Sequence, residues 1–487
     1  MNNYQKEIEK RVFDDADRQE ISPALKEFYE TSDRNRLDEI ASDMFPYEKK
    51  YMPRYDKDCD VLISTVGMRE APIILSFLAM QPKKGILLHT KKSEKIADMV
   101  MNDSTLFSLN IEFEKIEIDE VNAAKNYNIL KDEVLKQLGK EKVCVDPTGG
   151  RKIMGTAVGS FAFFFRIPMI YLHAEEKIGI NVPFTGQIHD IENPYEYYGD
   201  IELSLLKKHF DNYEFDSALK VCIELREMIK DPSLYAKLEM ISELVEIYRD
   251  WDAFLHSKYY IHSSKQNDET KLLDRLSRIK NKFERFNFAV INDDHLQNNI
   301  TFLQELDRCW LNKKNICDKY RLVDLYHNAR RRAEGGKFDD ATARLYRCME
   351  MCSTIELFKL GIEDPAKPDY ETFAGNINFN VETLFTIFKD KAKYDIPPRL
   401  ALDNQMILLS IAGNKIANIY FDMKKSTDAE STMDKRNRSI LAHGTNPITE
   451  KDYENMESKV RSIIVMTVGN KDFKKLDMQA MFPKIMI

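Results

Sequence analysis

The sequence predicts an α/β fold joined to an all-α region, with a Rossmann-like parallel sheet domain followed by a helical connector and a helical C-terminal domain. Two observations predict this fold class. Between residues 58 and 199, short apolar segments alternate with helical segments, which is typical of a parallel, doubly wound sheet. After Gly199 the strand signals largely vanish and the hydrophobic pattern becomes helical.

The length supports several domains, because 487 residues exceed what one hydrophobic core usually contains. We expect four parts. They are a helical N-terminal arm (1–57), the sheet domain (58–199), a helical connector (200–315) and a helical C-terminal domain (316–487).

Five apolar segments are expected to form the strands of the sheet. They are residues 61–67, 85–90, 111–119, 142–146 and 169–175. Four are bounded by Gly, Pro or Asp, which commonly end strands. The segments between them are long enough to be crossover helices. The turn-rich residues 177–199 predict an added hairpin.

The composition and the apolar segments indicate the cellular compartment better than they indicate the function. A net charge of −8 argues weakly against a general nucleic-acid coat, although a local basic patch can still bind RNA. The N-terminus lacks the apolar core of a secretory signal. The most apolar stretch, 155–165, is much shorter than the roughly 20 residues of a membrane helix. We therefore expect a cytoplasmic protein without membrane association. The seven cysteines show no metal-ligand spacing, so we expect thiols and no metal site.

A glycine-containing loop, DPTGGRKIM at residues 146–154, falls where the fourth strand should pass into a helix. Doubly wound folds place ligands at such junctions. Gly149 and Gly150 allow the backbone to approach a ligand, and the helix N-terminus with Lys152 favours an anion. Asp146 and Thr148 are suited to fixing the loop or binding a ribose. The alternative is that the two glycines only permit close helix packing.

A second loop, STVGMRE at residues 64–70, follows the first strand and should lie beside the DPTGG loop. Together the loops would form a cradle for a phosphate or nucleotide. Neither GxxxxGK[ST] nor a GxGxxG after the first strand is present, which disfavours an ordinary ATPase or a dinucleotide oxidoreductase.

The two loops resemble those of the CARF domain, a CRISPR-associated Rossmann fold that senses cyclic oligoadenylates. The resemblance covers about residues 58–190 and is strongest at DPTGGRKIM. It implies a homodimer whose loops close over cyclic tetra- or hexa-adenylate, an allosteric activator, with no other cofactor. By position it assigns ligand binding to Ser64, Thr65, Gly67, Thr148, Gly149, Gly150 and Lys152.

The stretch RNRSILAHGTNP, residues 436–447, combines arginines with a histidine near an expected helix end. If the helix continues, Arg436 and His443 return to within roughly 20° of one face, whereas Arg438 lies about 140° from His443. An arginine can hold a phosphate and a histidine can move a proton, which suffices for metal-free RNA cleavage by the substrate 2′-OH. The alternative is that these residues only complement the helix dipole.

The stretch also resembles the R-x₄₋₆-H signature of HEPN ribonucleases. Arg436, Asn437 and His443 fit the six-residue spacing. Arg438 fits the four-residue spacing, but Ser439 stands where the signature favours asparagine. The resemblance thus implies a catalytic set of Arg436, Asn437, Arg438 and His443, with Arg436 favoured.

Residues 328–351 resemble the helical region of CARF–HEPN ancillary RNases of type III CRISPR systems. This resemblance implies a cyclic-oligoadenylate-activated, metal-independent endoribonuclease that cleaves single-stranded RNA, but not DNA, in antiviral defence. Within this stretch, most of Arg330, Arg331 and Arg332 are expected on a basic, solvated face.

Two alternative functions remain open. One is a non-catalytic CARF-type regulator, which would need a recognition helix and a basic DNA face, and neither is identifiable. The other is a ring nuclease that degrades the cyclic oligoadenylate in the sensor domain. No sequence feature excludes that activity.

Overall fold

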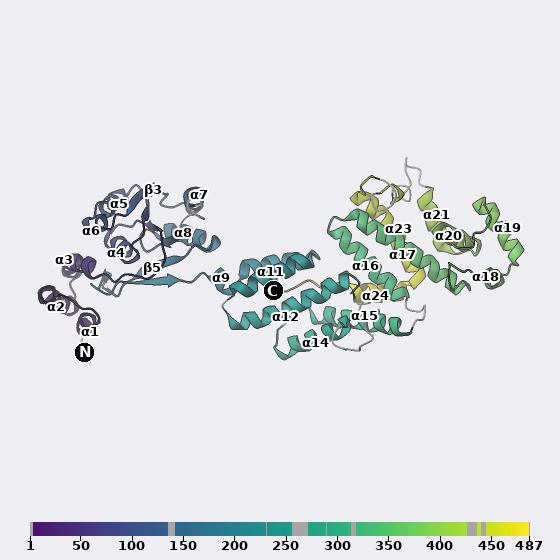
Figure 1. Ribbon diagram of the computed structural model, residues 1–487, viewed down its shortest axis with the longest axis horizontal. Coiled ribbons are helices and arrows are strands. Elements are labelled where there is room, and N and C mark those ends of the chain that lie inside the picture. The colour runs from purple at the N-terminus through teal and green to yellow at the C-terminus, as the bar shows by residue number, and fades with distance from the viewer. Residues whose placement is uncertain are drawn as a thin grey trace. The chain divides into compact units, whose positions relative to one another are not determined.

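The computed structural model divides the chain into two compact units, Met1–Gly199 and Asp200–Ile487 (Figure 1). Each unit is described below by itself. The four-part division stays a prediction. The structure describes residues 3–134, 142–229, 231–255, 271–288, 290–312, 318–425, 436–439 and 445–486.

The first unit is built on a six-stranded sheet with the order β3-β2-β1-β4-β5-β8. Five strands are parallel, and β8 pairs antiparallel with β5. All five expected strands are present, and the expected extra hairpin is present as the β6–β7 pair. The strands are β1 (Val61–Thr65), β2 (Lys84–His89), β3 (Glu112–Glu117), β4 (Val143–Asp146), β5 (Met169–His173), β6 (Glu176–Lys177), β7 (Ile180–Asn181) and β8 (Gln187–Ile191).

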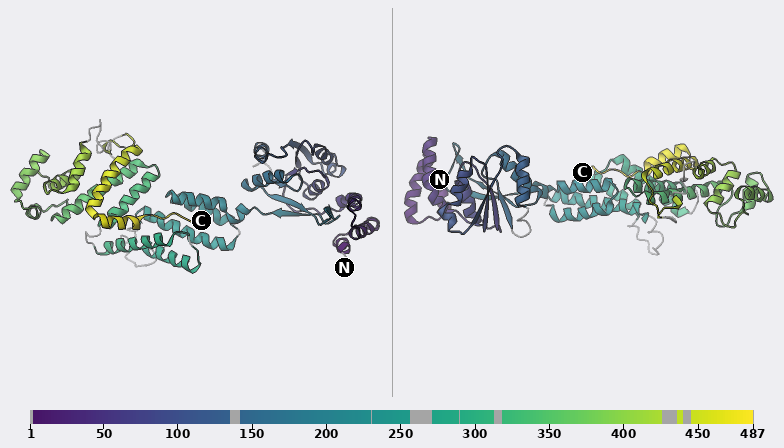
Figure 2. Two further views of the ribbon diagram at one scale, coloured as in Figure 1. Left: turned by 180° about the vertical axis from the view of Figure 1, so that it is seen from behind. Right: turned by 90° about the horizontal axis from the view of Figure 1, so that it is seen from above.

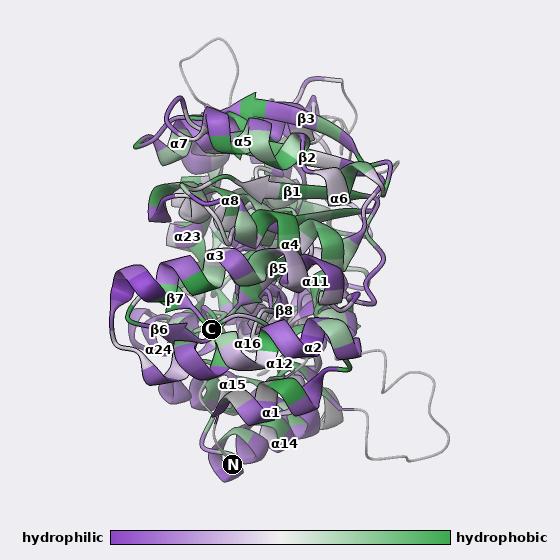
Figure 3. Ribbon diagram, turned by 90° about the vertical axis from the view of Figure 1, so that its left-hand side faces the viewer, coloured by the Kyte–Doolittle hydropathy of each residue, from purple (hydrophilic) through white to green (hydrophobic). Residues whose placement is uncertain are grey.

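Helices cover both faces of this sheet (Figure 2). In β1, Leu62 belongs to one apolar cluster, whereas Val61 and Ile63 belong to another on the opposite face. Burial on both faces explains why the strand is continuously apolar. Figure 3 shows the same apolar character in α4. The helices are α4 (Ala71–Met80), α5 (Glu94–Met101), α6 (Ser104–Phe107), α7 (Ala123–Val134), α8 (Lys152–Phe164) and α9 (Pro194–Tyr198).

Three N-terminal helices precede the sheet, and we call them the arm: α1 (Asn3–Lys10), α2 (Asp15–Glu30) and α3 (Arg34–Tyr51). Their apolar residues share a cluster with Ile180, Val182 and Phe184 from the β7 region. The buried carboxylate of Glu48 also accepts a hydrogen bond from the Phe184 amide at 2.7 Å. The arm is therefore packed onto the sheet domain.

The second unit is helical throughout its described residues, in agreement with the expected fold class. One apolar cluster extends from Leu206 to Ile485. No described helix is long and apolar enough to cross a membrane. The helices are α10 (Asp200–Asp211), α11 (Phe215–Met228), α12 (Pro232–Asp252), α14 (Leu272–Arg285), α15 (Asp293–Asn312), α16 (Asp318–Glu334), α17 (Phe338–Lys359), α18 (Tyr370–Asn376), α19 (Val381–Ala392), α20 (Leu402–Ile411), α21 (Lys415–Lys424), α23 (Glu450–Val468) and α24 (Asn470–Ala480).

Candidate functional site

The two glycine-containing loops of the sheet domain lie side by side. Parallel pairing of β1 with β4 places Ser64 opposite Asp146, so both loops leave the same edge of the sheet. The Thr65 hydroxyl donates a hydrogen bond to the Gly149 carbonyl and connects one loop to the other. The structure therefore brings together the residues that the sequence assigned to one ligand site.

Glycine is required at the contact between these loops. A Cβ atom on Gly149 would lie 2.1 Å from the Thr65 carbonyl oxygen, and one on Gly67 would lie 2.8 Å from the Gly150 nitrogen. Gly150 also has a φ of +81°, which side chains rarely adopt. The double glycine thus permits a close approach of two backbones.

The hydroxyl groups of this site hold the loops in place. Ser64 and Thr65 are fully buried. Buried Asp146 accepts hydrogen bonds from the Ser64 hydroxyl at 3.4 Å and the Thr148 amide at 2.9 Å. Burial raises the pKa of Asp146, and the hydrogen bonds from Thr148 and Ser64 partly oppose this rise. The Thr148 hydroxyl accepts from the Leu172 amide at 2.9 Å, which fixes the loop to β5.

Lys152 begins α8 and is exposed, as is Gly150. The first-turn amides of a helix have no acceptor within the helix, and its N-terminal end carries partial positive charge. No acidic residue lies in the first turn of α8. The part of the site most suited to an anion is therefore formed by Lys152, Gly150 and the half-buried Gly67.

The RNRSILAHG segment is described only at residues 436–439, so His443 lies outside the described residues. The expected continuous helix is wrong at its start. Arg436 and Asn437 are helical, but the chain turns at Arg438 and Ser439 forms a bridge with Asn446. The Asn446 amide also donates a hydrogen bond to the Arg438 carbonyl at 3.1 Å. Helical geometry therefore does not decide between Arg436 and Arg438.

Arg436 is positioned by an aromatic ring that the sequence analysis did not single out. Its guanidinium carbon lies 3.7 Å from the centre of the Tyr346 ring on α17. Its Nη1 donates to the Asn437 side-chain oxygen at 3.1 Å. Asn437 and Arg438 are exposed. No spacing signal connects Tyr346 to Arg436, because the contact joins distant parts of the chain.

The basic residues at 330–332 do not form a solvated face. Arg331 is 5% exposed, and its Nε donates to Asp252 at 2.7 Å. Arg332 donates to the same carboxylate at 2.6 Å, and Asn328 donates to it at 2.8 Å. The expected solvated position is wrong for Arg331 and Arg332. Both side chains form ion pairs with the buried Asp252 at the end of α12. The lone Asp252 gave no recognisable signal in the sequence.

Among the residues that the structure describes, no group of three or more His, Cys, Asp or Glu side chains is placed to hold a metal ion. The cysteines whose side chains are described, Cys59, Cys144, Cys222, Cys348 and Cys352, are free thiols.

The fold and these two sites define a protein with a Rossmann-like domain and a helical domain that contains an Arg–His segment. Residues 312–467 match the family model described as the Csm6 HEPN domain. The resemblance to CARF–HEPN proteins is thereby confirmed, with the family match confined to this region.

Two solved structures are similar to this chain. Csm6 from Enterococcus italicus, bound to cyclic hexa-2′-fluoro-hexa-dAMP, has 14% identity and a TM-score of 0.45, covering 86% of this chain and 97% of that chain. Can2 from Sulfobacillus thermosulfidooxidans, in complex with cyclic tetra-adenylate, has 14% identity and a TM-score of 0.22, covering 41% of this chain and 68% of that chain. A search of curated proteins found no match.

Proposed function

We propose that this protein is a metal-independent endoribonuclease that cleaves single-stranded RNA when a cyclic oligoadenylate binds, and that it acts in type III CRISPR antiviral defence. One observation carries this proposal. The RNRSILAHG segment lies within the residues that match the Csm6 HEPN domain, and HEPN domains are generally nucleases.

Arg436 is well suited to hold the scissile phosphate. The Tyr346 ring covers one face of the Arg436 guanidinium. The N–H groups point outward in the plane of the guanidinium, where they can donate hydrogen bonds to phosphate oxygens. Asn437 takes one of these hydrogen bonds and orients the group. The substrate 2′-oxygen then loses its proton and bonds to the adjacent phosphorus, while the bond from phosphorus to the 5′-oxygen breaks and that oxygen gains a proton. His443 would transfer one of these two protons as general acid or base.

The proposed activator binds at the paired loops of the sheet domain. Cyclic tetra- or hexa-adenylate would place its phosphates near Gly67, Gly150 and the α8 N-terminus with Lys152. In a homodimer, binding at this site would favour the arrangement in which two nuclease domains form a competent active site. The activator must bind the active state more tightly than the inactive state for this regulation to occur.

The proposal is tested by incubating the protein with labelled single-stranded RNA, each cyclic oligoadenylate ring size and EDTA. We expect cleavage with one ring size, a 2′,3′-cyclic phosphate product and resistance of DNA, which lacks the 2′-OH. His443→Ala should lower the rate by about 10² to 10⁴. The matched control is His209→Ala. His209 lies on α10 and is paired with Glu214, outside the proposed active site.

Parallel Arg436→Ala and Arg438→Ala variants decide which arginine acts with His443. Loss of cleavage in Arg436→Ala alone supports the six-residue spacing, and loss in Arg438→Ala alone supports the four-residue spacing. Inhibition of cleavage by EDTA, or parental activity in His443→Ala, would overturn the proposed chemistry.

A further inference from the structure

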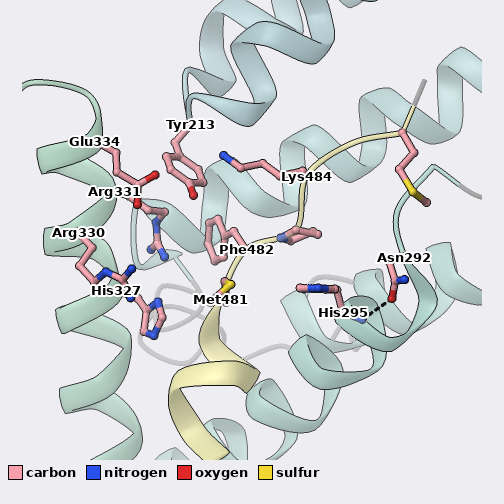
Figure 4. Close-up of a pocket in the computed structure, with 12 residues that line it drawn as sticks. Tyr213, Asn292, His295, His327, Arg330, Arg331, Glu334, Met481, Phe482 and Lys484 are labelled. Atoms are coloured by element: carbon pink, nitrogen blue, oxygen red, sulfur yellow. Dashed lines mark hydrogen bonds between the residues drawn. The ribbon is translucent and has the colours of Figure 1, made fainter. Parts of the chain in front are cut away.

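A pocket lies within the helical unit, and its lining includes none of the residues assigned above to activator binding or catalysis (Figure 4). Its cavity volume of about 410 Å³ is within the usual range for small-molecule sites. Figure 4 shows side chains from α15, α16 and residues 481–486 around it. The lining residues used in the following argument are Tyr213, His295, Arg330, Arg331, Phe482 and Lys484.

Arg331 lines this pocket with unused hydrogen-bond donors. The residue is 5% exposed, its Nε is paired with Asp252, and its guanidinium carbon lies 3.7 Å from the centre of the Phe482 ring. Its Nη1 and Nη2 atoms are buried and have no hydrogen-bond partner among the described residues. Leaving buried donors unpaired is unfavourable, so this end of the guanidinium is suited to an acceptor that the described residues do not provide.

A second unpartnered polar atom faces the same pocket. The Nδ1 atom of His295 is buried without a partner among the described residues, although the His295 backbone amide contacts Asn292 at 3.3 Å. Figure 4 shows His295 on the opposite side of the cavity from Arg331. Two successive helices, α15 and α16, therefore place unsatisfied polar atoms at one cavity.

The charges around the cavity favour an anion. Arg330, Arg331 and Lys484 are the cationic lining residues, and Glu334 is the one carboxylate among the residues that line this described pocket. Arg330 also lies 3.7 Å from Asp477, which reduces its share of the positive charge. Burial lowers the pKa of His327, and its hydrogen bond to Asp477 partly opposes this decrease.

The remaining walls favour an organic ligand over a bare ion. Met481, Phe482, Pro483 and Met486 supply an apolar side. The Lys484 ammonium lies 4.6 Å from the centre of the Tyr213 ring, so charge and aromatic surface are adjacent. A ligand with an anionic group and an aromatic body would cover both kinds of surface.

We propose that this pocket binds a nucleoside monophosphate. Its phosphate accepts hydrogen bonds from Nη1 and Nη2 of Arg331, which form a planar fork suited to two phosphate oxygens. Lys484 and His295 complete the polar contacts, and the base and ribose lie against the apolar wall. This site is separate from the paired loops that bind the proposed activator.

The proposal is tested with AMP, adenosine and inorganic phosphate by calorimetry on the full chain. AMP should bind at least about tenfold more tightly than adenosine, because a charge-assisted hydrogen bond typically accounts for that factor. Photo-crosslinking with 8-azido-AMP should label peptides containing residues 292–295 or 481–486. Equal affinity for AMP and adenosine, or labelling confined to residues 146–154, would overturn the proposal.

Two variants test whether AMP binds in this pocket without disturbing the ion pair between Arg331 and Asp252. His295→Ala and Lys484→Ala should each weaken AMP binding about tenfold, whereas Lys471→Ala, on α24, should not. Unchanged AMP affinity in both pocket variants would contradict the assignment. The result is independent of RNA cleavage, so failure of this proposal and failure of the proposed nuclease activity are distinguishable.

Discussion

Tyr346 supports the arginine that we propose to bind the scissile phosphate. Its ring is half-buried on α17, whereas Arg436 comes from a segment ninety positions later in the chain. The contact fixes the plane of the guanidinium, and the plane determines where its N–H groups point. The proposed catalytic geometry therefore depends on a residue that lies outside the R-x₄₋₆-H signature.

Replacing Tyr346 tests this dependence. Tyr346→Ala should slow RNA cleavage about 2- to 30-fold, because a cation–π contact contributes roughly 0.5 to 2 kcal/mol. Tyr346→Phe keeps the ring and should cleave near the parental rate. Single-turnover rates at saturating activator measure the effect, and thermal melting checks the fold. Parental activity in a folded Tyr346→Ala protein would show that the ring has no role in catalysis.

The sequence could identify individual residues only where the signal was local. Gly149 and Gly150 were recognisable because they follow an apolar strand and precede a helix. Asp252 and Tyr346 were not, because their partners lie far away in the sequence and single acidic or aromatic residues are common. The turn at Arg438 depends on a contact with Asn446, which helical periodicity does not reveal.

At the scale of elements, the contact between the β1 and β4 loops requires glycine. Gly149→Ala should destabilise the first unit by about 1 to 3 kcal/mol, the usual cost of inserting an atom into a packed site. Gly159→Ala is the matched control, because its Cβ would meet no atom within 4 Å in the middle of α8. Urea unfolding should show neutral or increased stability for this control. Equal stability of the two variants would contradict the tight loop contact.

The contact between α3 and the β7 region should depend on pH. Burial raises the pKa of Glu48 to about 7, and the Phe184 amide and Arg11 partly oppose this rise. Below about pH 4.5 the carboxyl is protonated in both the folded and the unfolded chain. As the pH rises toward about 7, the unfolded chain releases the proton first, so the free energy of unfolding falls.

Glu48→Gln should remove this dependence. The variant should be more stable than the parent at pH 8, by at most about 3 kcal/mol, and close to the parent near pH 4.5. Urea titrations of both proteins across this range measure the difference. A constant difference at all pH values would show that Glu48 titrates alike in the folded and unfolded states.

The sequence predicted the order of elements well because both faces of the sheet are buried. Continuous apolar strands such as β1 differ clearly from the helices that cross over between them. The antiparallel strand β8 was harder to recognise, since QIHDI carries polar and charged residues. It lies at the edge of the sheet, where one side of the strand needs no partner.

At the scale of the whole molecule, the proposed regulation predicts that a change in activator affinity leaves the maximal cleavage rate unchanged. Lys152→Ala should raise the activator concentration needed for half-maximal cleavage about 10- to 100-fold, since a charge-assisted contact to phosphate is lost. The rate at saturating activator should stay near the parental value, because the nuclease residues are unchanged. Lys95→Ala, an exposed lysine on α5, is the control. A lower maximal rate with unchanged half-saturation would contradict this role.

The continuous core of the helical unit has a consequence for the order of events during synthesis. Phe482 packs on Tyr248 and Trp251 of α12, with ring centres 4.9 and 5.0 Å apart. The amide of Ile485 also donates to Asp211 at the end of α10 at 2.9 Å. The first helices of this unit therefore cannot complete their packing until these late residues have left the ribosome. A nascent chain that already carries the RNRSILAHG segment still lacks part of its core, which delays the appearance of a stable helical unit until translation has passed residue 485.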